Sequence, residues 1–214
     1  MPMAETAPTP EVAAEAPAAT VAPSGAARVR RSSTTDLALV AAFAALVAAC
    51  AVVGGVPVGG AGVPITLQTL AVILAGVVLG PVRGFLAVAL YLALGGAGLP
   101  VLADHTSGLG VFTGMTAGYL WTFPLAAGLA GLLVRYAAGP RRTSALVVFL
   151  CAVPAMVLNH LAGVAGMKLN AHLGWSTAFA YDAPFWLGDT VKILVAALVA
   201  AEVHRAFPQL LRRR

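Results

Sequence analysis

The stretch APFWLGDTVKILVAALVAA, residues 183–201, is apolar enough to cross a bilayer except at two charged positions. These are Asp189 and Lys192, and an ionisable residue inside a membrane span costs about 2.5–3.5 kcal/mol. Because they are three residues apart, their side chains share one helical face and can turn together toward the protein interior. We therefore predict a membrane helix over residues 184–203 that holds a small polar solute near its outer end. The alternative is an ion pair that only locks this helix to its neighbours.

Composition places the whole chain among integral membrane proteins. Of its 214 residues, 60% are hydrophobic and 10% are charged, whereas soluble domains carry roughly 25% charged residues. The mean hydropathy is +0.91, and the pI of about 9.8 could indicate a nucleic-acid partner. The arginines, however, lie at the ends of apolar segments, which rejects that interpretation. Cys50 and Cys151 fall in apolar segments without disulfide or metal spacing, so we expect no metal and no cofactor.

Five further segments are apolar enough to span a membrane, although two of them are short. They cover residues 37–53, 65–79, 84–94, 117–133 and 145–166. We therefore predict an all-α membrane protein with six transmembrane helices. This count places all 11 arginines on one side, which the positive-inside rule assigns to the cytoplasm together with both termini. The two lysines, Lys168 and Lys192, then fall on the outer half. The location expected is the cell membrane of a bacterium.

The segments outside the helices differ in character. Residues 1–35 are rich in Ala and Pro and are predicted to form a disordered cytoplasmic tail. Residues 36–207 form the membrane domain, and 208–214 form a basic cytoplasmic tail. The two outer loops, residues 54–66 and 95–116, are rich in glycine. The second is unusually apolar, which fits a lid over a pocket and a flexible connector about equally well.

Several polar and aromatic residues toward the outer side are candidates for a binding site. Gln68 and Thr66 lie where the first outer loop meets the second span, although a helix–helix hydrogen bond would also explain Gln68. The aromatic candidates are Tyr91, Phe112, Tyr119 and Trp186. Trp175 and Tyr181 are assigned to the interfacial aromatic belt. Asn159 and His160 are predicted to form an interior polar pair.

Catalysis has no support in the sequence. The chain contains no HExxH, GxSxG or P-loop lysine motif, so it is predicted not to be an enzyme and not to hydrolyse ATP itself. A transporter of this kind must draw its energy from a partner or from a gradient. In the first span, Ala41, Ala45 and Ala48 form a small-residue face of the type that lets membrane helices approach closely. An alanine-rich composition alone would also produce this face.

Four separated blocks resemble one family. They are VPITLQTLAVILAGVVLGPVRG (63–84), YLALGGAGLPV (91–101), TAGYL (116–120) and PFWLGDTVK (184–192). In this order and spacing they are similar to the signature blocks of the BioY family, the biotin-specific S components of energy-coupling-factor (ECF) transporters. The resemblance covers about residues 37–201. Two departures are Met115 and Ala117, where the family usually has proline and glycine. Asp104 and His105 also stand where small residues are commoner.

The resemblance implies a membrane subunit with six helices that binds biotin tightly near the outer face. It also implies a membrane-embedded coupling subunit and two ATPases as partners, with the small-residue face of the first helix as the contact. The family's Gly-Asp-x-x-Lys motif falls on Gly188, Asp189 and Lys192. Asp189 could accept the ureido N–H groups of biotin, and Lys192 could donate to the ureido oxygen or to the carboxylate. The alternatives are an S component for thiamine or riboflavin, and a non-transport membrane protein with a structural Asp–Lys pair.

Overall fold

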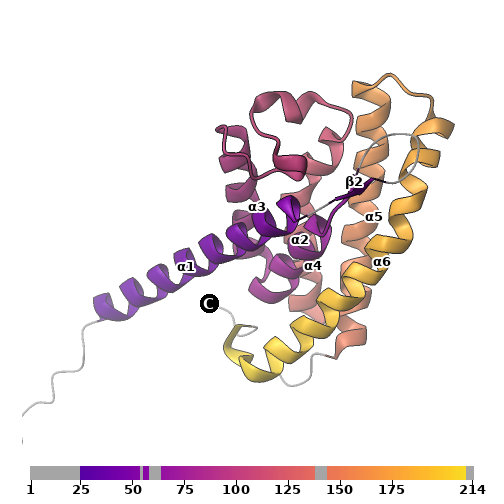
Figure 1. Ribbon diagram of the computed structural model, residues 1–214. Coiled ribbons are helices and arrows are strands. Elements are labelled where there is room, and N and C mark those ends of the chain that lie inside the picture. Colours follow the sequence, from indigo (N-terminus) through magenta and orange to yellow (C-terminus); the bar gives the residue numbers. More distant parts are fainter. Residues whose placement is uncertain (1–24, 54, 58–63, 138–143, 211–214) are drawn as a thin grey trace, which may run out of the picture.

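The computed structural model describes residues 25–53, 55–57, 64–137 and 144–210, which form six α-helices (Figure 1). The helices are α1 (Gly25–Val52), α2 (Gln68–Leu79), α3 (Pro81–Gly96), α4 (Ala117–Ala137), α5 (Ala145–Asn170) and α6 (Trp175–Ala206). The minor elements are the strands β1 (Val56–Pro57) and β2 (Pro64–Ile65) and the 3₁₀ helices η1 (Ala103–His105), η2 (Leu109–Thr113) and η3 (Pro208–Leu210). The predicted all-helical class is therefore confirmed, with one antiparallel two-residue strand pair added.

Four of the described helices are long and apolar enough to cross a membrane, namely α1 over Thr34–Val52, α4, α5 and α6. The other two, α2 and α3, have 12 and 16 residues. At 1.5 Å per residue they extend about 18 and 24 Å, less than the roughly 30 Å of a hydrocarbon core. Most residues of α2 are buried, because it contacts α1, α3, α4 and α6. The surrounding helices therefore cover most of α2, the shortest of the six.

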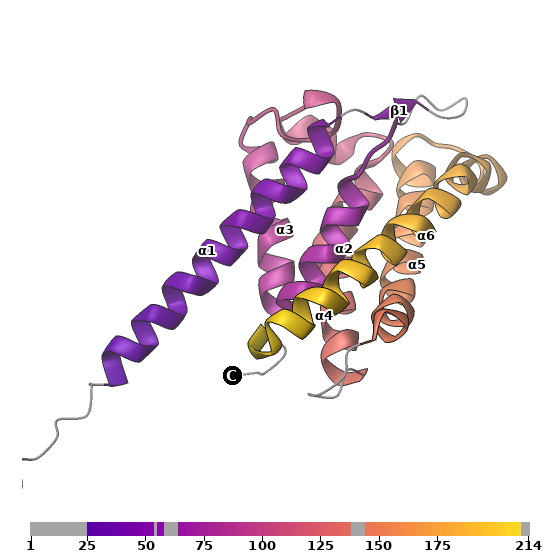
Figure 2. The ribbon, with the colours of Figure 1, turned by 60° about the horizontal axis from the view of Figure 1, so that its bottom comes forward.

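The bundle has two distinct ends (Figure 2). One end carries β1, the loop with η1 and η2, and the connection between α5 and α6. The opposite end carries the corner between α2 and α3 and the C-terminal end of α6. That corner turns at Gly80, whose φ of 84° suits glycine, and Pro81 then starts α3. At the start of α3, Arg83 pairs with Asp36 of α1 at 2.8 Å, which ties these two helices together.

One predicted helix start was wrong, and another helix is longer than its predicted span. The first helix begins at Gly25, although its candidate membrane span, Thr34–Val52, is close to the predicted 37–53; residues 1–24 and 211–214 lie outside the described residues. The last helix begins at Trp175, nine residues before Pro184. A proline removes only one backbone donor, and membrane helices tolerate this where neighbouring groups compensate. The helix therefore continues through Pro184 and includes Asp182, which the prediction had left outside.

Glycine allows the closest helix contacts around the core. A Cβ on Gly118 of α4 would overlap the backbone carbonyl of Ala162 on α5. A Cβ on Gly76 of α2 would likewise overlap the backbone of Ala127 on α4. Small residues of this kind let membrane helices approach backbone to backbone. Helix α4 therefore packs closely against both α2 and α5. This packing positions Tyr119 of α4 so that its hydroxyl reaches Asp182 of α6.

We predict that Gly118→Ala destabilises the protein by about 1–3 kcal/mol, because the added methyl group forces α4 and α5 apart. Thermal unfolding in detergent, followed by circular dichroism, measures this effect. Gly110→Ala is the matched control, since a Cβ there meets nothing within 4 Å. Equal melting temperatures for the two variants would contradict the close-packing account.

Candidate ligand-binding site

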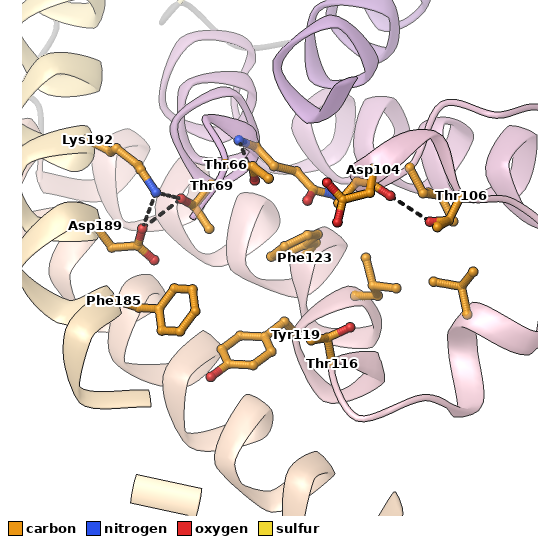
Figure 3. Close-up of a pocket in the computed structure, with 15 residues that line it drawn as sticks. Thr66, Thr69, Asp104, Thr106, Thr116, Tyr119, Phe123, Phe185, Asp189 and Lys192 are labelled. Carbon is orange, nitrogen blue, oxygen red and sulfur yellow. Dashed lines mark hydrogen bonds and ion pairs between the residues drawn. The ribbon is translucent and has the colours of Figure 1, made fainter. Parts of the chain in front are cut away.

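A cavity of about 240 Å³ lies between α2, α4 and α6, under the loop that carries η1 and η2 (Figure 3). This volume is near the lower end, roughly 300 Å³, of small-molecule sites. Its lining residues are Thr66, Gln68, Thr69, Leu102, Ala103, Asp104, Thr106, Val111, Thr116, Tyr119, Leu120, Phe123, Phe185, Asp189 and Lys192. Apolar walls with a few converging polar groups are typical of a binding pocket for a small organic molecule.

Asp189, Lys192 and the neutral Thr69 form a compact trio at the cavity wall. Lys192 Nζ lies 2.7 Å from Asp189 Oδ1 and donates to Thr69 Oγ1 at 3.2 Å. The Thr69 hydroxyl in turn donates to the same Asp189 oxygen at 2.9 Å, as Figure 3 shows. Both charged residues are over nine-tenths buried. A buried ion pair needs such added hydrogen bonds to offset its loss of hydration.

A second carboxylate, that of Asp182, does not line the cavity but contacts Tyr119, which does. It accepts three hydrogen bonds, from the Tyr119 hydroxyl at 2.6 Å, from His160 Nδ1 at 2.7 Å and from Trp186 Nε1 at 2.7 Å. Asp182 and His160 are each 1% exposed. Because Tyr119 lines the cavity, this network positions a cavity wall from α4 against α6.

Five of the sequence-predicted residues meet at the cavity, namely Thr66, Gln68, Tyr119, Asp189 and Lys192. The other three are not among its lining residues, for physical reasons that differ. Tyr91 is fully buried, and its hydroxyl accepts from Gln68 Nε2 at 2.7 Å, so it orients that amide.

The remaining two aromatic candidates face elsewhere. Phe112 packs against Trp121 at 5.2 Å between ring centroids, and its carbonyl accepts from the indole of that residue. Trp186 turns back along α6 to donate to Asp182. The predicted pairing of Asn159 with His160 was wrong, because His160 instead faces Asp182. Within the described residues, Asn159 Oδ1 has no hydrogen-bond partner.

Sequence reasoning missed Thr69 and Asp182. Thr69 follows Gln68 directly and lies one residue into α2, where its hydroxyl reaches α6. Asp182 lies seven residues, or two turns, before Asp189, so the two share one helical face. That spacing was a usable signal once the helix was extended through Pro184.

The loop between α3 and α4 is folded over the cavity. Its Leu102 is buried, and its Asp104 lines the cavity. Backbone bonds close it on itself, from Leu102 N to the Thr106 carbonyl and from Gly108 N to the Gly95 carbonyl. Asp104 and His105 adopt φ of 54° and 57°, the left-handed region that Asp and His enter more readily than most residues. These contacts favour the lid over the flexible connector.

The described residues contain no group of three or more His, Cys, Asp or Glu arranged to hold a metal ion. The polar groups of the cavity are instead donors and acceptors suited to an organic ligand. Hydroxyl, amide, carboxylate and ammonium groups all converge within one volume.

Comparison with known proteins agrees with this arrangement. The profile of the BioY family matches residues 23–209. The chain belongs to the BioY family. As a family member it is a multi-pass protein of the cell membrane, in accord with its long apolar helices.

Individual BioY relatives match over most of the chain. A biotin transporter BioY of Rhodobacter capsulatus is 42% identical over 185 residues, or 82% of this chain and 96% of the relative. A biotin transporter BioY of Rhizobium etli is 36% identical over 83% of this chain and 97% of its own. The fold is similar to a solved biotin S-component from an ECF-type ABC transporter, with a TM-score of 0.77 and 22% identity. That match covers 82% of this chain and 93% of the solved one.

Removal of one charge from the cavity pair should destabilise this BioY protein. Lys192→Met leaves Asp189 buried without its nearest cation, at a cost of about 3–5 kcal/mol. The double variant Asp189→Asn with Lys192→Met removes both charges and should regain most of that loss. Thermal unfolding of the three proteins tests this, and a double variant as unstable as Lys192→Met would contradict the pairing.

Proposed function

We propose that this chain is the biotin-binding subunit of an ECF transporter and mediates biotin uptake. It is a transport component and not an enzyme. The observation that carries the proposal is the Asp189–Lys192–Thr69 trio at the wall of a largely apolar cavity. The names of the BioY relatives and of the structural neighbour support biotin as the ligand.

Biotin has the chemistry that this cavity can accommodate. Its ureido ring offers two N–H donors and one carbonyl acceptor, which an aspartate and a lysine can satisfy with charge-assisted hydrogen bonds. Its thioether ring and aliphatic chain need apolar contacts. Phe123 of α4 and Phe185 of α6 supply aromatic walls (Figure 3). Thr66 and Gln68 add neutral polar groups at the end of the cavity near β2.

Energy for uptake comes, in this proposal, from a membrane-embedded coupling subunit and two cytoplasmic ATPases. The small-residue face of α1 is the proposed contact with the coupling subunit. Ala41 and Ala45 are exposed on this face, whereas Ala44, Val47 and Ala51 on the adjacent face of the helix are buried against the bundle. Ala48 is half-buried at the border between the two faces. An open alanine face on an edge helix suits a second membrane helix.

The full topology is part of the proposal. All six helices cross the membrane, with both termini in the cytoplasm and the glycine-rich loops outside. The distribution of arginine supports this, since Arg83 lies in the first turn of α3, Arg135 in the last turn of α4 and Arg205 in the last turn of α6. Lys168, in contrast, lies in the last turn of α5, near the opposite end.

Purified protein in detergent should bind radiolabelled biotin tightly. Asp189→Asn and Lys192→Ala should each weaken binding at least about tenfold, or 1.4 kcal/mol, because each removes a charge-assisted contact. Thr190→Val is a matched control, since the Thr190 hydroxyl bonds only to the Trp186 carbonyl of its own helix. Folded wild-type protein that does not bind biotin would refute the proposal, and thiamine and riboflavin would be tested next.

Substitutions on the proposed partner face of α1 should affect uptake without affecting biotin binding. The double variant Ala41→Leu with Ala45→Leu should bind biotin normally but reduce ATP-driven uptake in the assembled transporter, because leucine prevents close helix approach. Ala180→Leu on α6 is the control, as that alanine is also exposed but distant in sequence and on another helix. Unchanged uptake in the α1 variant would show that coupling uses a different face.

Cysteine labelling tests whether the short helices cross. Thr113→Cys should react with a membrane-impermeant maleimide in intact cells, whereas Val82→Cys at the α2–α3 corner should react only after permeabilisation. Both positions are exposed on the protein. The unmodified chain, with Cys50 and Cys151 inside apolar helices, sets the background. Labelling of Val82→Cys in intact cells would mean that α2 and α3 do not span.

A further inference from the structure

We propose that His160 is held as an imidazolium between two buried carboxylates and balances the charge of the biotin site as a positioning residue. His160 is on α5 and does not line the cavity. Its Nδ1 lies 2.7 Å from Asp182 Oδ1, and its Nε2 lies 3.5 Å from Asp189 Oδ2. Each ring nitrogen therefore faces a carboxylate of α6, and the two carboxylates lie two turns apart on the same helical face.

This geometry determines the protonation state. A neutral imidazole carries one N–H, so one of its two nitrogens would present a lone pair to a carboxylate oxygen. The doubly protonated ring presents an N–H to both. The contact to Asp182 is a full hydrogen bond, and the contact to Asp189 is a longer electrostatic one. Attraction to both carboxylates thus requires the imidazolium form.

Charge balance leads to the same state. Within the described part of the chain, Asp182 accepts three hydrogen bonds and donates none, the pattern of an acceptor-only carboxylate. With Asp182 and Asp189 negative and Lys192 positive, the buried cluster would carry one net negative charge. A protonated His160 brings it to zero. Uncompensated charge is costly in a low-dielectric interior, so the neutral cluster is favoured.

The neighbouring rings are consistent with a cation. The indole of Trp186 stacks on the imidazole at 4.4 Å between centroids and 19° between planes. The face of an indole attracts a cation through its quadrupole. Tyr119 of α4 approaches edge-on at 6.4 Å and donates its hydroxyl to Asp182. The remaining polar neighbours are Asn159 on α5 and, around Asp189, Thr69 on α2 and Lys192 on α6.

The consequence for the ligand follows from Asp189 and Tyr119, which line the cavity. With His160 protonated, Asp189 Oδ2 faces a cation while Oδ1 is held by Lys192 and Thr69. Loss of the His160 proton would leave a net negative cluster beside the cavity. That negative charge would repel an anionic ligand such as biotin, which carries a carboxylate. Asp189 Oδ2 would also lose the cation that fixes its orientation. This consequence rests on the proposed function, but the protonation state does not.

Nitrogen-15 NMR of histidine-labelled protein in nanodiscs, without biotin, tests the protonation state directly. The chain has four histidines, and the signal that disappears in His160→Gln identifies His160. We expect an imidazolium signal for it at about pH 8, where an ordinary histidine is neutral. Asp182→Asn should convert it to the neutral form at the same pH. A neutral ring in the wild type would overturn the proposal.

A second test measures biotin binding in variants that first remove and then restore the charge balance of the cluster. His160→Gln should weaken binding at least about tenfold, and the double variant His160→Gln with Asp182→Asn should restore most of it, because the cluster is neutral again. His172→Gln, at an exposed histidine, should bind as the wild type does. A double variant no tighter than His160→Gln would overturn the proposal. If His160→Gln does not fold, replacement of the other three histidines by glutamine leaves His160 as the only histidine, and the NMR result on that protein decides.

A wild type that binds no biotin would contradict the proposed function alone, since the NMR measurement needs no ligand. An imidazolium at His160 together with absent biotin binding would mean that the balanced cluster serves another solute. A neutral His160 together with tight biotin binding would mean that the site works without this residue's charge. The two proposals therefore fail separately.

Discussion

The cost of burying charge in a membrane is the constraint on which the rest of the site depends. Helix α6 carries Asp182, Asp189 and Lys192 on one face, and each needs partners that water would otherwise supply. The partners come from three other helices: Thr69 on α2, Tyr119 on α4 and His160 on α5. The binding cavity lies where these helices converge on α6, so the groups that stabilise the fold also form the polar wall of the site.

The sequence predicted much of this arrangement, because its signals are physical and local. Two charges in an otherwise apolar segment indicated an inward-facing helix, and the polar Thr66 and Gln68 at the start of the second span indicated further residues of a binding site. What could not be predicted depends on side-chain direction. Trp186 is one turn from Asp189 yet turns back to Asp182, and Tyr91 supports Gln68 from behind. Asp182 was missed because a proline was taken as a helix start.

The fold separates the tasks that the proposed function assigns to it. The ligand cavity is formed by α2, α4, α6 and the lid loop, whereas the open alanine face belongs to α1 at the edge of the bundle (Figure 2). Glycine contacts clamp α4 between α2 and α5, so the cavity walls are held by backbone packing rather than by long side chains. A closely packed cavity suits a subunit that binds its solute without partners. The exposed face of α1 suits docking of the partner subunits that drive transport.

A structure of the protein determined with biotin bound tests the central claim most directly. The account predicts biotin density inside the cavity, with the ureido group or the carboxylate in contact with Asp189 and Lys192. The lid loop should lie over the ligand. Density in the separate apolar groove between α3 and α4, lined by Phe85 and Trp121, would contradict the account. So would biotin in the cavity with no contact to either charged residue.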